Sequence, residues 1–203
     1  MQISLNNVGK RFNREWIFRH ITYEFTPGKK YAITGSNGSG KSTLLQVLSG
    51  SLSYNEGKVN FSREDKLVEE EHNYLHIALA APYLELIEEM TATEFLSFHK
   101  KFKALKLSEK EILLIIGLQK AANKQIRYFS SGMKQRLKLA QAFFTEAPIL
   151  LLDEPTTNLD ADGIALYHLL INNCTSNKLV IISSNDLQEY NFCEAVLSMG
   201  DFK

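Results

Sequence analysis

A run of nine residues sets the architecture to be expected of this chain: Gly35-Ser36-Asn37-Gly38-Ser39-Gly40-Lys41-Ser42-Thr43. The run fits the pattern G-x-x-x-x-G-K-[ST] at every fixed position. Residues 30–34 before it are apolar at their centre, as in a buried strand, and residues 43–48 after it have the apolar spacing of a helix. The sequence therefore predicts a strand, a phosphate-binding loop and a helix in succession.

The residue types in this loop suit a phosphate group bound by backbone atoms. Glycines leave room for backbone N–H groups to curl round an anion, and the following helix directs its positive end at the same group. In this interpretation Lys41 contacts the β- and γ-phosphates, Ser42 ligates Mg²⁺, and the N–H groups of residues 38–43 bind phosphate oxygens. The alternative is an ordinary Gly/Ser-rich turn, which the flanking strand and helix disfavour.

Size and composition are those of an ordinary globular chain. It has 203 residues, 44% of them apolar, and 23 basic side chains balance 23 acidic ones. This balance gives no global attraction to nucleic acid or to an anionic membrane. Apolar runs such as residues 112–116 fall far short of the roughly 20 residues that cross a bilayer. We expect a soluble cytoplasmic chain without a signal peptide, in which Cys174 and Cys193 are reduced thiols.

Further elements follow from apolar patterning and turn signals. Before and just after the loop, strands alternate with polar turns, so a small antiparallel β unit is expected at the N-terminus. Helical patterns dominate from residue 91 to residue 146, where Thr91 and Glu94 form a capping-box pattern. The predicted strands are 2–8, 21–25, 58–61 and 74–79, the predicted helices are 41–49, 108–117 and 131–145, and 69–71 is a predicted solvated acidic loop.

Three phenylalanines share one face of the first helix of this helical part. Phe95, Phe98 and Phe102 follow one another at the spacing i, i+3 and i+7. A helix with such a stripe buries it against the core or against a partner. We expect this face to serve packing or docking rather than to bind a cofactor.

An apolar run over residues 149–152 ends in two carboxylates, Asp153 and Glu154. A strand buried on both faces is typical of a parallel sheet, and ligands bind at the carboxyl ends of such strands. Asp153 is therefore expected beside the phosphate loop, where it ligates Mg²⁺ directly or through water. Glu154 is expected to polarise an attacking water as general base or orienter, and the alternative is a surface acid that follows a strand. Residues 178–183 and 195–199 are predicted to complete the sheet.

The stretch Phe129-Ser130-Ser131-Gly132-Met133-Lys134-Gln135-Arg136 lies between the helices and this strand. The order of motifs and this stretch resemble the nucleotide-binding domain of ATP-binding cassette (ABC) proteins, whose signature loop reads roughly LSGGQ followed by Gln-Arg. Here Ser131 replaces a Gly and Met133 replaces the Gln. The resemblance covers essentially the whole chain and implies an α/β P-loop NTPase fold with a mostly parallel sheet core, a small N-terminal antiparallel β subdomain and an inserted α-helical subdomain.

The resemblance also implies a domain plan and an assembly. Residues 1–203 would form one ABC domain, with residues 1–80 and 147–203 as the core and residues 83–146 as the helical subdomain. Ser130, Ser131 and Gly132 would contact the γ-phosphate of ATP held by a second copy, so that the working form is a head-to-tail homodimer around two Mg-ATP. Asp160 would lie at the dimer seam.

An aromatic side chain is expected to stack on the adenine. Phe12 lies 29 residues before Lys41, close to the position of the family's stacking aromatic. Trp16 is the alternative candidate.

Two family positions depart from the pattern. No Gln occurs between Gln46 and Gln119, so Pro82 or Tyr83 occupies the place of the usual Mg²⁺-linked Gln, with Glu85 as a weak substitute. Asn185 occupies the place of the switch His. An Asn can donate a hydrogen bond to a γ-phosphate but carries no proton or charge near neutral pH. We therefore expect ATP binding and dimer closure with slow hydrolysis.

The function implied is that of the ATP-hydrolysing subunit of an ABC transporter, with ATP and Mg²⁺ as ligands. It would sit on the inner face of the cell membrane against a separate transmembrane permease, and the short chain and the signature favour an export type. Two alternatives stay open: a non-transport ABC ATPase acting on nucleic acid or ribosomes, and a regulatory ATP-binding module with negligible turnover. No nucleic-acid partner is expected.

Overall fold

The computed structural model describes residues 1–64 and 66–203. The chain divides into two compact units. One, here called the sheet unit, consists of Met1–Leu79, Pro148–Glu154 and Asn177–Lys203, and the other, the helical unit, consists of Ala80–Ala147 and Pro155–Ser176. Residues 155–176 thus group with the helices rather than with the sheet.

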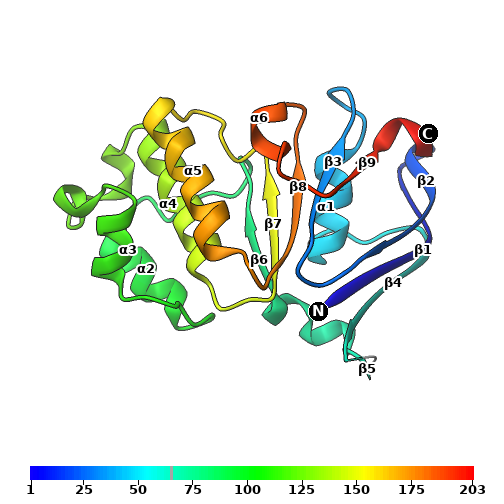
Figure 1. Ribbon diagram of the computed structural model, residues 1–203, viewed down its shortest axis with the longest axis horizontal. Helices are drawn as coiled ribbons and strands as arrows, with labels where there is room; N and C mark the ends of the chain where they lie inside the picture. The colour runs from blue at the N-terminus through cyan, green and yellow to red at the C-terminus, as the bar shows by residue number, and fades with distance from the viewer. Residues whose placement is uncertain (65) are drawn as a thin grey trace. The chain divides into compact units, whose positions relative to one another are not determined.

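A five-stranded sheet in the order β6-β7-β8-β3-β9 forms the centre of the sheet unit (Figure 1). Strand β3 runs parallel to both β8 and β9, and β7 runs parallel to β8. Every residue of β7 and β8 is buried, which explains their uninterrupted apolar sequences. The bounds are β3 (Lys30–Thr34), β6 (Ile77–Ala80), β7 (Ile149–Asp153), β8 (Leu179–Ser183) and β9 (Ala195–Ser198).

Helix α1 (Lys41–Ser49) follows β3 through the glycine-rich loop and packs against β7 and β8. The predicted strand at 30–34 and the predicted helix at 41–49 are both confirmed at their bounds. Gly50 ends the helix with φ 76°, and its N–H bonds to carbonyls of the last turn, as a glycine cap does.

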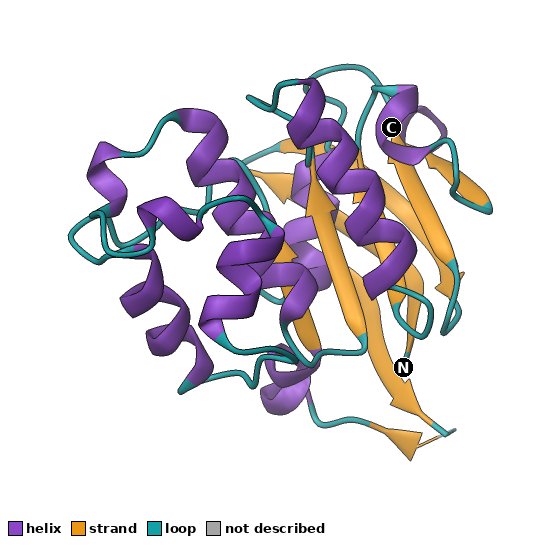
Figure 2. Cartoon of the chain, turned by 60° about the vertical axis from the view of Figure 1, so that its left-hand side comes forward, coloured by secondary structure: helices purple, strands orange, loops and turns teal. Residues whose placement is uncertain are grey.

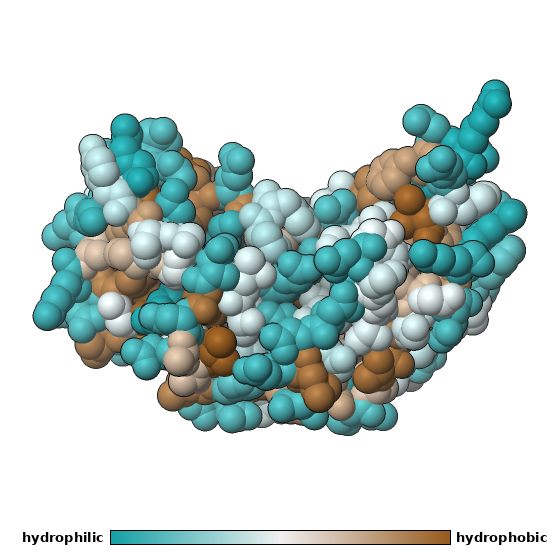
Figure 3. Space-filling model, turned by 90° about the horizontal axis from the view of Figure 1, so that it is seen from above, coloured by the Kyte–Doolittle hydropathy of each residue, from teal (hydrophilic) through white to brown (hydrophobic). Residues whose placement is uncertain are grey.

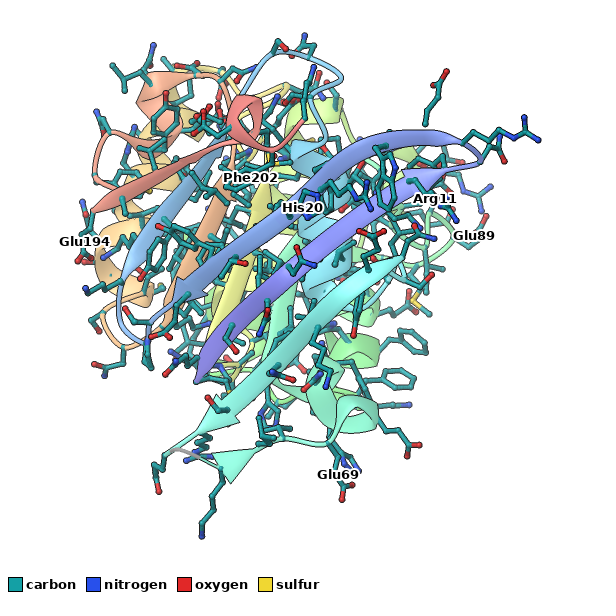
Figure 4. All side chains as sticks on the ribbon, turned by 90° about the vertical axis from the view of Figure 1, so that its right-hand side faces the viewer. Arg11, His20, Glu69, Glu89, Glu194 and Phe202 are labelled. Atoms are coloured by element: carbon teal, nitrogen blue, oxygen red, sulfur yellow. The ribbon has the colours of Figure 1, made fainter. Side chains whose placement is uncertain are left out.

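A second, antiparallel sheet of order β2-β1-β4-β5 completes this unit. Figure 4 views it face on, with Arg11 near the end of the β1–β2 hairpin and His20 on β2. The hairpin turns at Asn13, whose φ is 53°. The predicted N-terminal antiparallel unit is confirmed, with longer strands than expected: β1 (Gln2–Phe12), β2 (Glu15–Phe25), β4 (Glu56–Arg63) and β5 (Lys66–Leu67).

Both sheets and α1 contribute to one hydrophobic core. Phe18 and Phe25 of β2, Ile33 of β3, and Leu44 and Leu48 of α1 are all fully buried in it. Such burial is the main stabilising contribution to the fold. It also fixes the hairpin and the glycine-rich loop to the same framework.

The helical unit consists of helices joined by loops and short 3₁₀ turns (Figure 2). Two of its helices begin with a complete capping box, Thr91 with Glu94 and Ser108 with Glu111. Each pair satisfies two N–H groups at the helix start, those of the N-cap residue and of the Glu. The bounds are α2 (Ala92–Lys100), α3 (Glu109–Ile115), η2 (Gln119–Ala121), η3 (Ile126–Tyr128), α4 (Ser131–Phe144) and α5 (Ala161–Cys174).

Two sequence-based expectations are wrong in part. The predicted strand at 74–79 forms only from Ile77, because the preceding residues belong to a 3₁₀ helix, η1 (Glu70–His76), which also takes in most of the predicted acidic loop. The predicted phenylalanine face is split: Phe95 is buried, whereas Phe98 and Phe102 are exposed and stack edge to face. Phe102 lies beyond the end of α2, so it leaves the stripe.

The remaining short elements are α6 (Leu187–Tyr190) and η4 (Met199–Phe202). None of the helices within the described residues is long and apolar enough to span a membrane. On the face seen in Figure 3, hydrophobic residues occur as separate patches among hydrophilic ones. Within the described residues neither Cys174 nor Cys193 forms a disulfide, and burial raises the pKa of Cys193 to about 12.

Candidate functional site

The glycine-rich loop has a backbone that only small residues allow. Gly35, Gly38 and Gly40 have φ values of 143°, 78° and 99°, which L side chains rarely adopt. A Cβ on Gly40 would lie 2.6 Å from Ile17, and one on Gly35 would lie 2.6 Å from the Ser39 hydroxyl. The loop therefore curls tightly and packs against Ile17 of β2.

Lys41 lies inside this curl. Its side chain is 5% exposed, and its Nζ donates to Gly35 O at 2.8 Å and to Ser36 O at 3.4 Å. No ion pair among the described residues involves it. A buried ammonium group held only by carbonyl oxygens is suited to receive an anion.

The start of α1 adds N–H donors to the same place. Gly40 is the N-cap residue and supplies no side-chain cap, so N–H groups of the first turn are left for a ligand. Ser42 and Thr43 belong to this first turn and are half-buried. The N-terminus of a helix is positive, which adds to the charge of Lys41.

The parallel register brings the second predicted motif to the same sheet edge. Asp153 at the end of β7 is opposite Ser183 of β8, which in turn is opposite Ile33 of β3. The phosphate-binding loop starts two residues after Ile33. Thus three strand ends that are far apart in the sequence meet at one edge.

Three polar atoms at this edge are buried and have no hydrogen-bond partner within the part of the chain that is described: Asp153 Oδ1, Ser39 Oγ and Ser183 Oγ. Asp153 is only 2% exposed. A buried carboxylate oxygen without a donor is costly unless a cation binds it. Its chemistry fits Mg²⁺, which takes one or two protein oxygens and otherwise phosphate oxygens and waters. The described residues contain no cluster of three or more His, Cys, Asp or Glu side chains that could hold a metal ion together.

Glu154 differs from Asp153 in its exposure and in its backbone conformation. Its side chain is exposed, its φ is 42°, and its N–H donates to Ser183 O at 2.9 Å. Positive φ is uncommon for a residue other than glycine and is frequent at functional sites. Glu154 therefore follows the strand end with an exposed carboxylate.

Asn185 contacts the phosphate-binding loop directly. Its Oδ1 accepts from Gly35 N–H at 3.2 Å, and its Nδ2 donates to Asn37 Oδ1 at 3.3 Å. The backbone beside it is fixed by Ser184 N–H, which donates to Ile33 O at 3.1 Å. The structure therefore places this predicted site residue against the loop.

The two candidate stacking aromatics have different surroundings. Phe12 is 48% exposed at the end of β1. Trp16 is half-buried, packs against Gly9 and contacts the guanidinium groups of Arg19 and Arg11 at 4.4 and 5.4 Å from its ring. Of the two, Phe12 is the more exposed.

The signature stretch begins α4 in the helical unit. Ser130 is the N-cap, and its hydroxyl accepts from Met133 N–H at 3.2 Å. Ser130 and Ser131 are exposed, and a Cβ on Gly132 would approach Asn158 O to 3.1 Å. These residues border a hollow of about 520 Å³ that is also lined by Gly117, Lys120, Arg136, Asn158 and Asp160.

Helix α4 is tied to residues 155–160 by two side chains. Gln135, which is buried, donates to Pro155 O at 2.8 Å, and Arg136 donates to Asp160 Oδ1 at 2.8 Å. Asp160 also caps α5 by accepting from Gly163 N–H at 2.9 Å. The Gly163 N–H, and then the Arg136 side chain, lower the pKa of Asp160 below its ordinary value. The predicted seam residue is therefore an ionised helix cap.

The segment at the place of the missing Gln also contacts α4. Pro82, Tyr83 and Glu85 are exposed, and Lys138 Nζ donates to Pro82 O at 3.0 Å. Burial lowers the pKa of Lys138, while Glu85 opposes this change. Among the described residues, no contact of Glu85 indicates that it binds a ligand in place of the missing Gln.

Two sets of contacts are not predicted from the sequence. Gln135 and Arg136 match a family pair, but the pattern does not indicate that they bind residues 155–160. Lys10 is 6% exposed and lies against the Phe12 ring, although a lysine near a polar turn is typical of a solvated surface. The spacing of these residues in the sequence predicts neither contact.

Comparison with known proteins finds a matching family model and similar relatives. A family model described as "ABC transporter" matches residues 18–157. The chain is 33% identical over 203 residues, 98% of its length and 92% of the relative's, to the uncharacterized ABC transporter ATP-binding protein YybJ of Bacillus subtilis (strain 168). It is 32% identical over 153 residues, 74% of its length and 68% of the relative's, to the cytochrome c biogenesis ATP-binding export protein CcmA of Xylella fastidiosa (strain 9a5c).

Solved structures show the same fold. The ATP-binding cassette MJ0796, in a dimeric post-hydrolysis state bound to ADP and Pi, superposes with a TM-score of 0.81 at 24% identity and covers 97% of this chain and 93% of that one. At this identity the likeness concerns the fold alone.

Proposed function

The chain belongs to the ABC transporter family as an ATP-binding protein, and on this basis we propose that it is an ATP-hydrolysing subunit that drives a separate membrane-spanning partner. The observation that carries the proposal is that one sheet edge holds both the buried Lys41 and Asp153 Oδ1, which has no hydrogen-bond partner among the described residues. A cation and a carboxylate at one edge suit a nucleotide phosphate and its Mg²⁺.

ATP binding follows from the loop. Backbone N–H groups of residues 38–43 and the Lys41 ammonium would neutralise the β- and γ-phosphates. Ser42 and Asp153 would hold Mg²⁺, which supplies charge neutralisation of the phosphate oxygens when bound. Phe12 would stack on the adenine with its exposed ring.

Glu154 would act on water. Its free carboxylate is suited to orient a water and to accept one of its protons as the water oxygen bonds to the γ-phosphorus. The bond from that phosphorus to the bridging oxygen then breaks, and the electron pair leaves with ADP. Lys41 stabilises the charge that develops on the transferred group.

The working form would be a dimer of two copies arranged head to tail. Ser130 and Ser131 are exposed at the start of α4 and Gly132 is half-buried beside them, as a surface for the γ-phosphate bound to the other copy requires. Asp160 would lie at the seam. The dimeric state of MJ0796 supports such an arrangement, and the export named for CcmA supports an export-type permease as partner on the inner face of the membrane.

Turnover would be slow. The amide of Asn185 cannot carry charge near neutral pH, and in this structure it is bonded to Gly35 and Asn37. No Gln stands at the place filled by Pro82 or Tyr83. Loss of one positioned donor lowers turnover by about 10² to 10³ in other enzymes.

Steady-state phosphate release with Mg-ATP tests this proposal, measured for the purified chain alone and together with any membrane protein that co-purifies. We expect a rate at least about a hundredfold below the ordinary enzyme value of about 10 s⁻¹. A rate in the ordinary range would contradict slow turnover. ATP binding with no release in the assembled complex would instead identify a regulatory module, and co-purified nucleic acid would favour a non-transport ATPase.

A further inference from the structure

A buried lysine lies beside the candidate stacking residue. Lys10 is 6% exposed, whereas lysines are almost never fully buried without a partner. No ion pair within the described ranges involves it. Its Nζ instead donates to Ser53 O at 2.7 Å and lies 4.9 Å from the centre of the Phe12 ring.

The same region of the hairpin is fastened to the segment that follows α1. Asn55 N–H donates to Gly9 O at 2.8 Å, and Arg11 N–H donates to Asn55 Oδ1 at 2.9 Å. With the bond from Lys10 to Ser53, three hydrogen bonds join residues 9–11 to residues 53–55. This fixes the end of the hairpin relative to α1, the helix that begins at the phosphate-binding loop.

A cation over one face of an aromatic ring is attracted to it and holds its orientation. Phe12 is 48% exposed, so the ring keeps accessible surface for a base while Lys10 contacts it. A ring that is already oriented loses less side-chain freedom when a ligand binds. The lysine thus places Phe12 at a set position relative to the loop that holds the phosphates.

We propose that Lys10 is a positioning residue for nucleotide binding, which holds the Phe12 ring against the base through its ammonium group and its bond to Ser53. This inference rests on the proposed function, in which Phe12 stacks on adenine. Lys10 itself touches neither the base nor the phosphates.

Calorimetric binding of two probes, ATP and inorganic tripolyphosphate, to the full chain tests the proposal. We expect Lys10→Met to weaken ATP binding by about 5- to 10-fold. Tripolyphosphate has no base, so its affinity should change by less than about twofold on the same scale. Lys58→Met is the matched control, because Lys58 is an exposed lysine of the same antiparallel sheet, and it should alter neither affinity.

Two further variants separate charge from structure. Lys10→Arg keeps the cation and should retain most of the ATP affinity, whereas Lys10→Gln keeps an N–H donor for Ser53 O without the charge and should show the selective loss. Thermal unfolding without ligand identifies which variants are folded. The ratio of the ATP affinity to the tripolyphosphate affinity is compared only among those variants. Equal loss for ATP and tripolyphosphate, or no difference between Lys10→Met and Lys58→Met, would overturn the proposal.

Phe12→Ala distinguishes failure of this inference from failure of the proposed stacking. If Phe12→Ala weakens ATP selectively and the Lys10 variants do not, only the role of Lys10 is refuted. If Phe12→Ala has no selective effect, base stacking by Phe12 is refuted as well. In the Phe12→Ala background, Lys10→Met should cause no additional selective loss, since the ring it positions is gone.

Discussion

The side chain of Asn185 holds the first residue of the phosphate-binding loop: its Oδ1 accepts the N–H of Gly35 at 3.2 Å, across 150 positions of sequence. From the resemblance in the order of motifs, we predict that this is the position of the family's switch His. Because the amide has no titratable group near neutral pH, this contact keeps the same charge over the physiological range.

Replacement of Asn185 by His tests this difference. We expect Asn185→His to raise steady-state phosphate release by at least about tenfold, because under the proposed function a stronger donor would face the γ-phosphate. The rate should also vary with pH around about 6.5, the ordinary pKa of His, while the unaltered chain shows no change there from this position. Asn185→Ala is the control and should not be faster. If Asn185→His releases phosphate no faster than Asn185→Ala, residue 185 has no role in hydrolysis.

Removal of the free carboxylate at residue 154 should trap the ATP-bound form. Glu154→Gln keeps the size of the side chain but not its basicity, so we expect hydrolysis to fall by about 10² or more. Size-exclusion chromatography should then show a dimer only with Mg-ATP. Glu194→Gln, at the opposite end of the sheet near Lys30, should behave as the unaltered chain. If the unaltered chain dimerises equally and never hydrolyses ATP, Glu154 is not catalytic.

Two glycine substitutions separate backbone strain from steric contact. Gly40 and Gly50 both have positive φ, but a Cβ at Gly40 would meet Ile17 at 2.6 Å and one at Gly50 would meet open space. Gly50→Ala should lower the free energy of unfolding by about 1–2 kcal/mol from strain alone. Gly40→Ala should add about 1–3 kcal/mol for the contact and should also abolish ATP binding. Chemical denaturation of both variants measures the difference, and equal losses would contradict it.

The buried amide of Gln135 should stabilise the connection from α4 to residue 155. Gln135→Leu removes the donor to Pro155 O and leaves that carbonyl without it, so we expect a loss of about 1–3 kcal/mol in the free energy of unfolding. Gln141→Leu, on the same helix and only partly buried, is the control and should cost less. Urea denaturation compares them. A similar cost for both would mean that the bond to Pro155 contributes nothing specific.

Acid should weaken the chain through His99. Burial, and to a lesser degree Lys103, lowers the pKa of His99 to about 4, and its ring bonds to Thr145 Oγ1 at 2.8 Å. Since the unfolded chain binds the proton at higher pH than the folded chain does, stability is lost as the pH falls from about 6.5 towards about 4. His99→Gln should flatten the melting temperature over this range. An unchanged slope would assign the acid sensitivity to other groups.

Local chemistry determined several elements of the chain. The strand 30–34, the helix 41–49 and its glycine cap, and the capping boxes at Thr91 and Ser108 all depend on residues close together in sequence. For the same reason the apolar run that ends in Asp153 was recognisable as a buried strand. Where the pattern was apolar without a clear period, as at residues 74–79, it could not separate a 3₁₀ turn from a strand.

Only the tertiary structure decided which distant residues meet. The strand order β6-β7-β8-β3-β9 brings Asp153, Ser183 and the start of the glycine-rich loop to one edge, and pairing order cannot be read from any single segment. Packing likewise buried Lys10 against Phe12 and split the phenylalanine stripe. The sequence by itself predicted the glycine-rich loop and its lysine, because backbone conformation and charge are local properties. The contacts that position this chemistry required the folded chain, because they join residues far apart along it.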